Sequence, residues 1–118
     1  MLTDKIVLVC GVGGGIGTAR SIAKAYSVFA TGGKELGLRE ETLRQLMAPA
    51  VPPTNGFYDE VMKLEGMEMS LGFMKPSQKV PFAHPSSFGM LGFGGCIVFA
   101  DPQASIGFAY VPNLTDFY

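Results

Sequence analysis

The sequence predicts an α+β fold in which helices of the first half precede antiparallel strands of the second half. Three observations support this fold class. Apolar residues recur at helical spacing between 19 and 30, and a strand-turn-strand pattern runs from 96 to 111. Sixteen glycines and eight prolines are many for 118 residues, and those of the second half interrupt it often, which favours short strands and turns there.

The N-terminal third predicts one strand followed by one helix. The run KIVLVCGV, residues 5–12, is β-branched and apolar and is typical of a buried strand. Thr18 is placed to cap a helix over 19–30, whose apolar residues repeat at helical spacing. Gly32 and Gly33 then supply the helix stop. We therefore expect an amphipathic helix with one face in the core.

A second, shorter helix is expected over 39–47. Glu40 and Glu41 lie in its first turn and Arg44 lies later, which is the charge order that the helix dipole favours. Prolines beginning with Pro49 end it, because proline cannot continue a helix. The following segment, 52–60, is polar and rich in turn residues, so we expect a connection there.

The second half predicts strands. Residues 67–75 alternate enough to form one strand, which Pro76 closes. A hairpin is expected beyond it, with strands at 96–100 and 106–111 and a turn at 101–103.

Composition restricts the possible partners. Nine basic and ten acidic residues give a net charge of −1, which provides no electrostatic basis for binding nucleic acid or an anionic membrane. The longest apolar run, 6–12, is too short to span a bilayer, and Asp4 beside Lys5 makes a poor signal-peptide start. Cys10 and Cys96 lie in apolar runs without His or Cys neighbours. We expect a soluble, cytoplasmic protein with buried thiols and no metal site.

A glycine loop raises the possibility of a nucleotide site. Gly11, Gly15 and Gly17 have the spacing with which short-chain dehydrogenases hold a dinucleotide pyrophosphate at a helix N-terminus. Glu35 stands at about the right distance for the ribose but outside any convincing strand, and no Tyr-x-x-x-Lys pair occurs. We interpret the glycines as a turn and keep a small NAD(P)-binding module as the alternative.

Ser21 and Lys24 satisfy a Ser-x-x-Lys spacing, which on a helix places a hydroxyl beside an amine. A working nucleophile also needs a lysine of lowered pKa and an oxyanion hole, normally at a helix start that faces a cleft. Ser21 instead falls about one turn into an ordinary amphipathic helix. We interpret the pair as residues of a solvated helix face.

Three blocks of the sequence, 15–49, 70–76 and 88–113, carry a family resemblance. In this order they resemble the C-terminal portion of the serine β-lactamase-related family, which includes class C β-lactamases, related esterases and animal β-lactamase-like proteins. The resemblance implies a partial β-lactamase/transpeptidase-like fold. It divides the chain into an N-terminal strand segment of uncertain origin, 1–14, and a truncated β-lactamase-related domain, 15–118.

The family hydrolyses esters, amides or lactams through an acyl-serine. By resemblance, Ser21 and Lys24 lie on a helix away from the acylated serine, and the family's own Ser-x-x-Lys and Tyr-x-Asn motifs belong N-terminal to the matched region. The resemblance therefore implies a hydrolase fragment that is inactive alone and carries no catalytic residue and no cofactor. Self-association, or pairing with a full-length relative, is the expected partnership, because a truncated sheet exposes an edge strand.

The third family motif is a Lys or His, any residue, and then Gly, on a strand that lines the substrate cleft. Here the resemblance aligns Met90, Leu91 and Gly92 with these positions, and Phe93 with the residue whose backbone N–H completes the oxyanion hole. Met90 neither donates a proton nor holds a charge, so the motif is degenerate. His84 lies six residues upstream, and we expect a surface or packing role for it.

Overall fold

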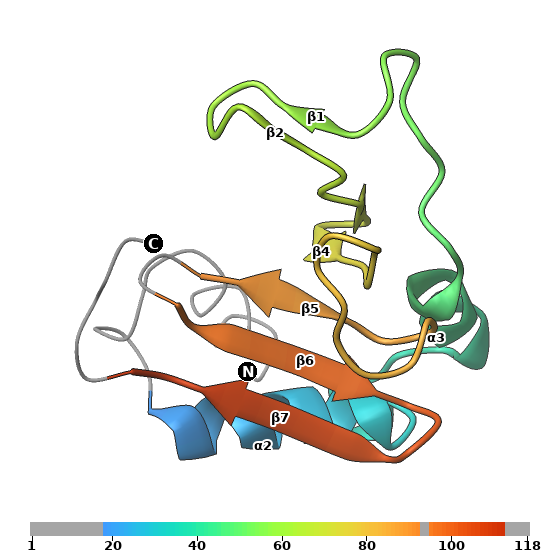
Figure 1. The fold of residues 1–118 in the computed structure, drawn as a ribbon. Helices are drawn as coiled ribbons and strands as arrows, with labels where there is room; N and C mark the ends of the chain where they lie inside the picture. The colour runs from blue at the N-terminus through green and yellow to red at the C-terminus, as the bar shows by residue number, and fades with distance from the viewer. Residues whose placement is uncertain (1–17, 93–94, 113–118) are drawn as a thin grey trace.

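A computed structural model describes residues 18–92 and 95–112 of the chain (Figure 1). Helix α2 (Ala19–Ala30), the 3-10 helix η1 (Lys34–Leu36) and helix α3 (Glu40–Met47) come first. The strands follow as β1 (Tyr58–Asp59), β2 (Leu64–Glu65), β3 (Met69–Ser70), β4 (Phe73–Met74), β5 (Phe88–Leu91), β6 (Ile97–Asp101) and β7 (Ile106–Tyr110). This order confirms the predicted α+β class with helices ahead of antiparallel strands.

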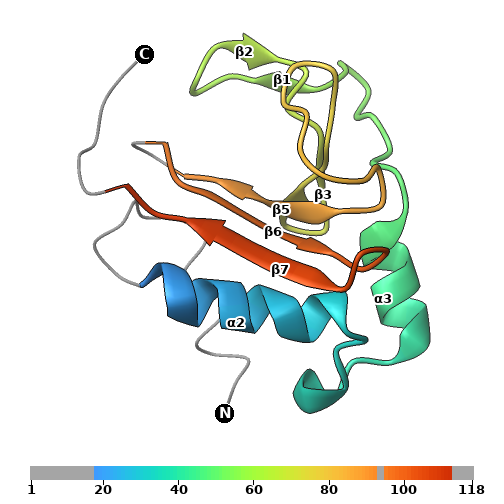
Figure 2. The ribbon, with the colours of Figure 1, turned by 60° about the horizontal axis from the view of Figure 1, so that its bottom comes forward.

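A five-stranded antiparallel sheet with the order β3-β4-β5-β6-β7 forms the centre of the fold. Helix α2 packs along β6 and β7 on one face of this sheet, as Figure 2 shows. Strands β1 and β2 form a separate two-stranded hairpin, which Figure 1 shows on the far side of the sheet from α2. Strand β5 lies at the middle of the sheet, between β4 and β6.

The β6–β7 hairpin confirms the hairpin predicted near the C-terminus. Its register runs from Ile97 opposite Tyr110 to Asp101 opposite Ile106. The turn occupies 102–105, slightly later than predicted, because Asp101 remains in the ladder. The Asp101 carboxylate then accepts hydrogen bonds from the turn N–H groups.

Both predicted helices are present. Thr18 caps α2, its Oγ1 accepting from the Ser21 N–H at 3.2 Å, and the helix spans the predicted residues. After the helix, Gly33 has a φ of 68°, and its N–H bonds to the Val28 carbonyl at 2.8 Å. Helix α3 begins at Glu40 with Arg39 as its cap, one residue later than predicted.

The single strand predicted over 67–75 is wrong. The segment instead folds back on itself as the β3–β4 hairpin, with Leu71 at φ 50° and Gly72 at φ 85° in the turn. Positive φ at both central residues is the geometry of the tight turns that suit the twist of paired strands. The alternation of apolar residues continues across Leu71 and Gly72, so it does not show where the chain reverses.

The connection predicted over 52–60 also contains regular structure. Tyr58 pairs with Glu65, and Asp59 pairs with Leu64, in the β1–β2 hairpin. The Asp59 carboxylate accepts from the N–H groups of the two residues Val61 and Met62, at 2.9 Å each. This turn chemistry closes the hairpin, and composition alone did not predict it.

Four aromatic rings, two from α2 and one each from β4 and β5, hold α2 on the sheet. Phe29 of α2 meets Phe73 of β4 and Phe88 of β5, each at a centroid distance of 5.8 Å, and Phe73 lies 5.1 Å from Phe88. Tyr26 lies edge-on to Phe73 at 6.3 Å. Such pairs are worth about 0.5–1.5 kcal/mol each beyond the apolar area that they bury. The core is therefore built from contacts between the helix and the middle of the sheet.

Gly107 of β7 lets α2 approach the sheet closely. A Cβ added there would fall on the backbone of Ala23 and Ser27, with the Ser27 Cα only 2.6 Å away. Only glycine leaves room for this contact between helix and strand backbones.

Several predictions fall on residues outside the described ranges. They are the strand at 5–12, Gly11, Gly15 and Gly17, Cys10, Phe93 and the boundary between residues 14 and 15. Cys96 is described and is buried, as predicted. Among the described helices, none is both long and apolar enough to cross a membrane.

Candidate functional site

The residues that the resemblance aligns with the family's third motif lie on, and directly after, the central strand of the sheet. Met90 and Leu91 are in β5, opposite Val98 and Ile97 of β6, and Gly92 follows directly. The Gly92 N–H donates to the Cys96 carbonyl at 2.8 Å, which continues the pairing beyond the strand. The backbone of this segment is paired on the β6 side, whereas the β4 ladder reaches β5 only at Gly89, opposite Met74.

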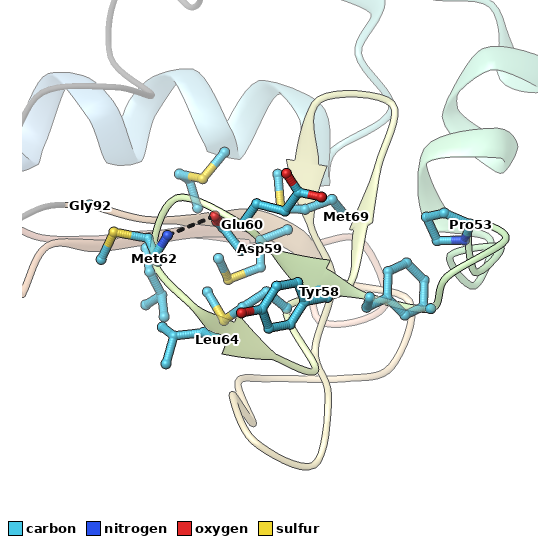
Figure 3. Close-up of a pocket in the computed structure, with 14 residues that line it drawn as sticks. Pro53, Tyr58, Asp59, Glu60, Met62, Leu64, Met69 and Gly92 are labelled. Carbon is cyan, nitrogen blue, oxygen red and sulfur yellow. Dashed lines mark hydrogen bonds between the residues drawn. The ribbon is translucent and has the colours of Figure 1, made fainter.

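Met90, Leu91 and Gly92 form one wall of a pocket of about 770 Å³, and Figure 3 shows how the other walls face it. The β1–β2 hairpin with the chain leading into it supplies a second wall, and β3, β4 and the residues before them supply the third. The full lining comprises Pro53, Gly56, Phe57, Tyr58, Asp59, Glu60, Met62, Leu64, Met67, Met69, Met74, Met90, Leu91 and Gly92. A volume of this size falls in the range of small-molecule sites, roughly 300–1,000 Å³.

The lining is apolar and rich in methionine. Five of the seven methionines of the chain contribute to it: Met62, Met67, Met69, Met74 and Met90. Met74 is almost fully buried, with 4% of its surface exposed, whereas Met62 and Met69 are exposed. A thioether is only a weak hydrogen-bond acceptor and does not transfer protons, so these walls offer shape and polarisability.

Polar groups at the pocket are few. The Asp59 carboxylate is occupied by the hairpin turn, and Figure 3 shows its bond to the Met62 N–H. Tyr58 and Glu60 are exposed on the hairpin. The described lining contains no serine, cysteine, histidine or lysine. It therefore offers neither a serine or cysteine nucleophile for acyl transfer nor a basic nitrogen to activate one.

Ser21 and Lys24 lie elsewhere. Figures 1 and 2 both place α2 beyond β7, on the other side of the sheet from the β1–β2 hairpin. Ser21 Oγ donates to the Thr18 carbonyl at 3.0 Å and lies 3.0 Å from Thr18 Oγ1, so it is part of the helix cap. Both Ser21 and Lys24 are exposed. This arrangement favours the interpretation of the pair as helix-surface residues.

His84 is an exposed turn residue ahead of β5. Its Nδ1 lies 2.8 Å from Ser86 Oγ, and its backbone carbonyl accepts from the Ser87 N–H at 2.8 Å. These bonds stay within the turn, so His84 helps to shape the entry of the chain into β5. A surface role matches the sequence prediction.

The structure reveals a buried lysine that sequence reasoning missed. Lys75, directly after β4, is 2% exposed, and its Nζ donates to the Leu46 carbonyl at 2.8 Å. The ammonium group also lies 5.6 Å from the centre of the Phe88 ring. Burial lowers the pKa of Lys75 to about 8. Its role is structural, since it satisfies a carbonyl in the last turn of α3.

No metal site is apparent in the part of the chain that the structure describes, because no three His, Cys, Asp or Glu side chains gather there. Gly11, Gly15 and Gly17, which carry the nucleotide alternative, lie outside those residues.

Comparison with known proteins supports the predicted relationship. No known protein-family model matches the chain, and no curated protein matches it. A solved structure, the crystal structure of a family VIII carboxylesterase, superimposes with a TM-score of 0.68 at 30% sequence identity. The match covers 86% of this chain and 27% of that chain, so this chain spans about a quarter of the carboxylesterase's length.

The shared architecture defines the class of protein: an α+β chain with a partial β-lactamase-like fold. The combination of fold and identity supports the broad family of β-lactamase-related serine hydrolases. It does not favour the alternative of an NAD(P)-binding module.

Proposed function

We propose that this chain is a C-terminal part of a β-lactamase-related hydrolase that keeps the cleft strand of the family and does not catalyse acyl transfer alone. The observation that carries the proposal is the composition of the pocket beside β5. By the resemblance, Met90 stands at the position of the family's Lys or His, and the described lining contains no Ser, Cys, Lys, Arg or His.

Acyl transfer through a serine needs a nucleophile, a base and an oxyanion hole in one place. The only described Ser-x-x-Lys pair, Ser21 with Lys24, is exposed on α2, and the Ser21 hydroxyl is taken up by the helix cap. Losing the chemical groups of such a site costs several orders of magnitude in rate. The pocket is therefore large enough for a ligand, but its described lining does not supply the groups that acyl transfer needs.

A fluorescent fluorophosphonate tests the proposal, because it labels activated serines covalently. The purified chain and its Ser21→Ala variant are treated in parallel, with a family VIII carboxylesterase as the positive control. We expect labelling of the carboxylesterase and only the background of a heat-denatured sample for both forms of this chain. Labelling of the folded chain that disappears in Ser21→Ala would overturn the proposal and identify Ser21 as a nucleophile.

A second function, self-association, is favoured by the outer face of β7. Ile106, Phe108 and Tyr110 form an outward row in which each side chain is at least 41% exposed. Phe108 stacks on Phe99 of β6 with centroids 5.0 Å apart, so the row continues onto the neighbouring strand. We propose that a second copy of the chain covers this row, since exposed apolar strands favour pairing.

Sedimentation velocity tests this second proposal. We expect the chain to sediment as a dimer, Phe108→Lys to sediment as a monomer, and Val51→Lys to behave as the original chain. Val51 is the matched control because it is 83% exposed and lies outside the row. A monomeric original chain would refute self-association, and addition of a full-length relative would then show whether that partner binds instead.

A further inference from the structure

We propose that the methionine-lined pocket binds a single-chain amphiphile whose head group is neutral or cationic, not anionic. The inference rests on the proposed function, since a pocket without a nucleophile holds its ligand unchanged. Its three supports are the exposure of apolar side chains around the pocket, the chemistry of methionine, and the charge of the polar lining.

Four exposed apolar side chains lie around this pocket. Tyr58, Met62, Leu64 and Met69 all line it, and they are 46%, 60%, 45% and 40% exposed, respectively. Scattered single exposures are ordinary on protein surfaces, but a contiguous group around a cavity marks a binding site. An apolar chain inserted between the β1–β2 hairpin and β5 would cover these side chains.

Methionine suits a flexible aliphatic ligand. Its unbranched side chain is flexible and its sulfur is polarisable, so methionine-rich surfaces adapt to ligands of varied shape. Met74 and Met90 come from neighbouring sheet strands, whereas Met62 comes from the hairpin opposite. A chain held between these two walls would contact thioethers on both sides. Because few polar groups are placed to orient a ligand, we expect the walls to accept apolar chains of varied shape.

The charge of the lining selects the head group. Among the residues that the structure describes, the carboxylates of the lining belong to Asp59 and Glu60, and no Lys, Arg or His lines the pocket. Asp59 is engaged in the hairpin turn, whereas Glu60 is exposed beside the pocket. Lys63, at the hairpin turn, does not line the cavity. A carboxylate or sulfate head would meet negative charge without a compensating cation, whereas an ammonium or hydroxyl head would not.

Methyl-labelled methionine provides a direct readout of binding. Decyltrimethylammonium and decanoate, kept below their micelle concentrations, and decanol, kept below its solubility limit, are titrated into the chain labelled with ¹³C-methyl methionine. We expect the first two probes to shift the methyl signals of the five pocket methionines and to leave that of Met47 in α3 unchanged. Decanoate should bind more weakly than either. No shift at the pocket methionines with any probe would overturn the inference, and preference for decanoate would overturn the head-group assignment.

Two matched pairs of variants locate the site. Leu64→Ser should weaken binding of both favoured probes about fivefold, because it removes apolar contact area. Leu71→Ser changes a leucine that is 63% exposed but does not line the pocket, and it should leave binding unchanged. Glu60→Gln should reduce the preference for the cationic probe about threefold, the effect of one exposed charge. Glu35→Gln, in η1, should leave the preference for the cationic probe unchanged. If the two leucine variants, or the two glutamate variants, changed binding equally, the probe would bind at another site.

The same samples separate this inference from the proposed function. Hydrolysis of a decanoate ester by the chain would refute the absence of catalysis while leaving the pocket assignment standing. Absence of both hydrolysis and binding would refute the pocket assignment alone.

Discussion

Replacing Lys75 with methionine isolates what its buried ammonium does to stability. The variant keeps an unbranched side chain of similar length beside Phe88 and removes the charge and the hydrogen bond to the Leu46 carbonyl. In the folded protein burial lowers the pKa of Lys75 from 10.5 to about 8. The folded state therefore releases this proton at a lower pH than the unfolded chain does.

The sign and size of the effect follow from this difference. Below about pH 8 both states are protonated, and the full cost of burying the charge opposes folding. Between about pH 8 and 10.5 only the unfolded chain retains the proton, so the contribution of Lys75 to the free energy of unfolding rises with pH. A difference of about 2.5 pH units corresponds to a rise of about 3 kcal/mol.

At pH 7 we expect Lys75→Met to be close to the original chain in stability. Relief of the buried charge, about 3 kcal/mol, offsets the loss of the Leu46 hydrogen bond, about 1.5–3 kcal/mol. As the pH rises toward 10.5, the free energy of unfolding of the original chain should increase by about 3 kcal/mol relative to that of the variant.

Urea unfolding followed by circular dichroism measures this prediction at several pH values from 7 to 10.5. Subtracting the variant from the original chain cancels the titration of cysteines and tyrosines, which both forms share. Lys34→Met, in η1 at an exposed position, serves as the control for loss of a lysine charge. If the stability difference between the original chain and Lys75→Met stays constant across this pH range, the Lys75 ammonium is not desolvated and the reasoning fails.

Two further substitutions test how the sheet is built. Gly107→Ala should lower the free energy of unfolding in urea by about 1–3 kcal/mol, because the added Cβ would collide with the α2 backbone. Ile106→Ala, on the opposite face of β7, should lower it less. Equal losses for the two variants would contradict the close approach of α2. Asp101→Ala should cost about 1–3 kcal/mol by removing an acceptor for the N–H groups of Gln103 and Ala104. Asp101→Asn retains a carbonyl oxygen and should recover most of that loss, so equal melting temperatures for the two Asp101 variants would refute the turn assignment.

The candidate site was only partly predictable. A family resemblance placed Met90, Leu91 and Gly92 on a cleft strand, and the structure puts all three in the pocket wall. The opposite wall was missed, because 52–60 was expected to be an irregular connection. Its hairpin depends on Asp59 bonding to backbone groups two and three residues ahead, a detail that composition does not reveal.

By itself, the sequence determined the elements whose stabilising contacts are local. The α2 helix with its Thr18 cap and the β6–β7 hairpin depend on neighbours within a few residues, so pattern and turn chemistry were enough to predict them. Only the tertiary structure decided which distant residues meet. Lys75 is buried because Leu46, 29 residues earlier, presents a carbonyl to it, and Gly107 is required because α2 crosses β7 at that point. Such contacts depend on how the helix and sheet pack together, and no local pattern records that packing.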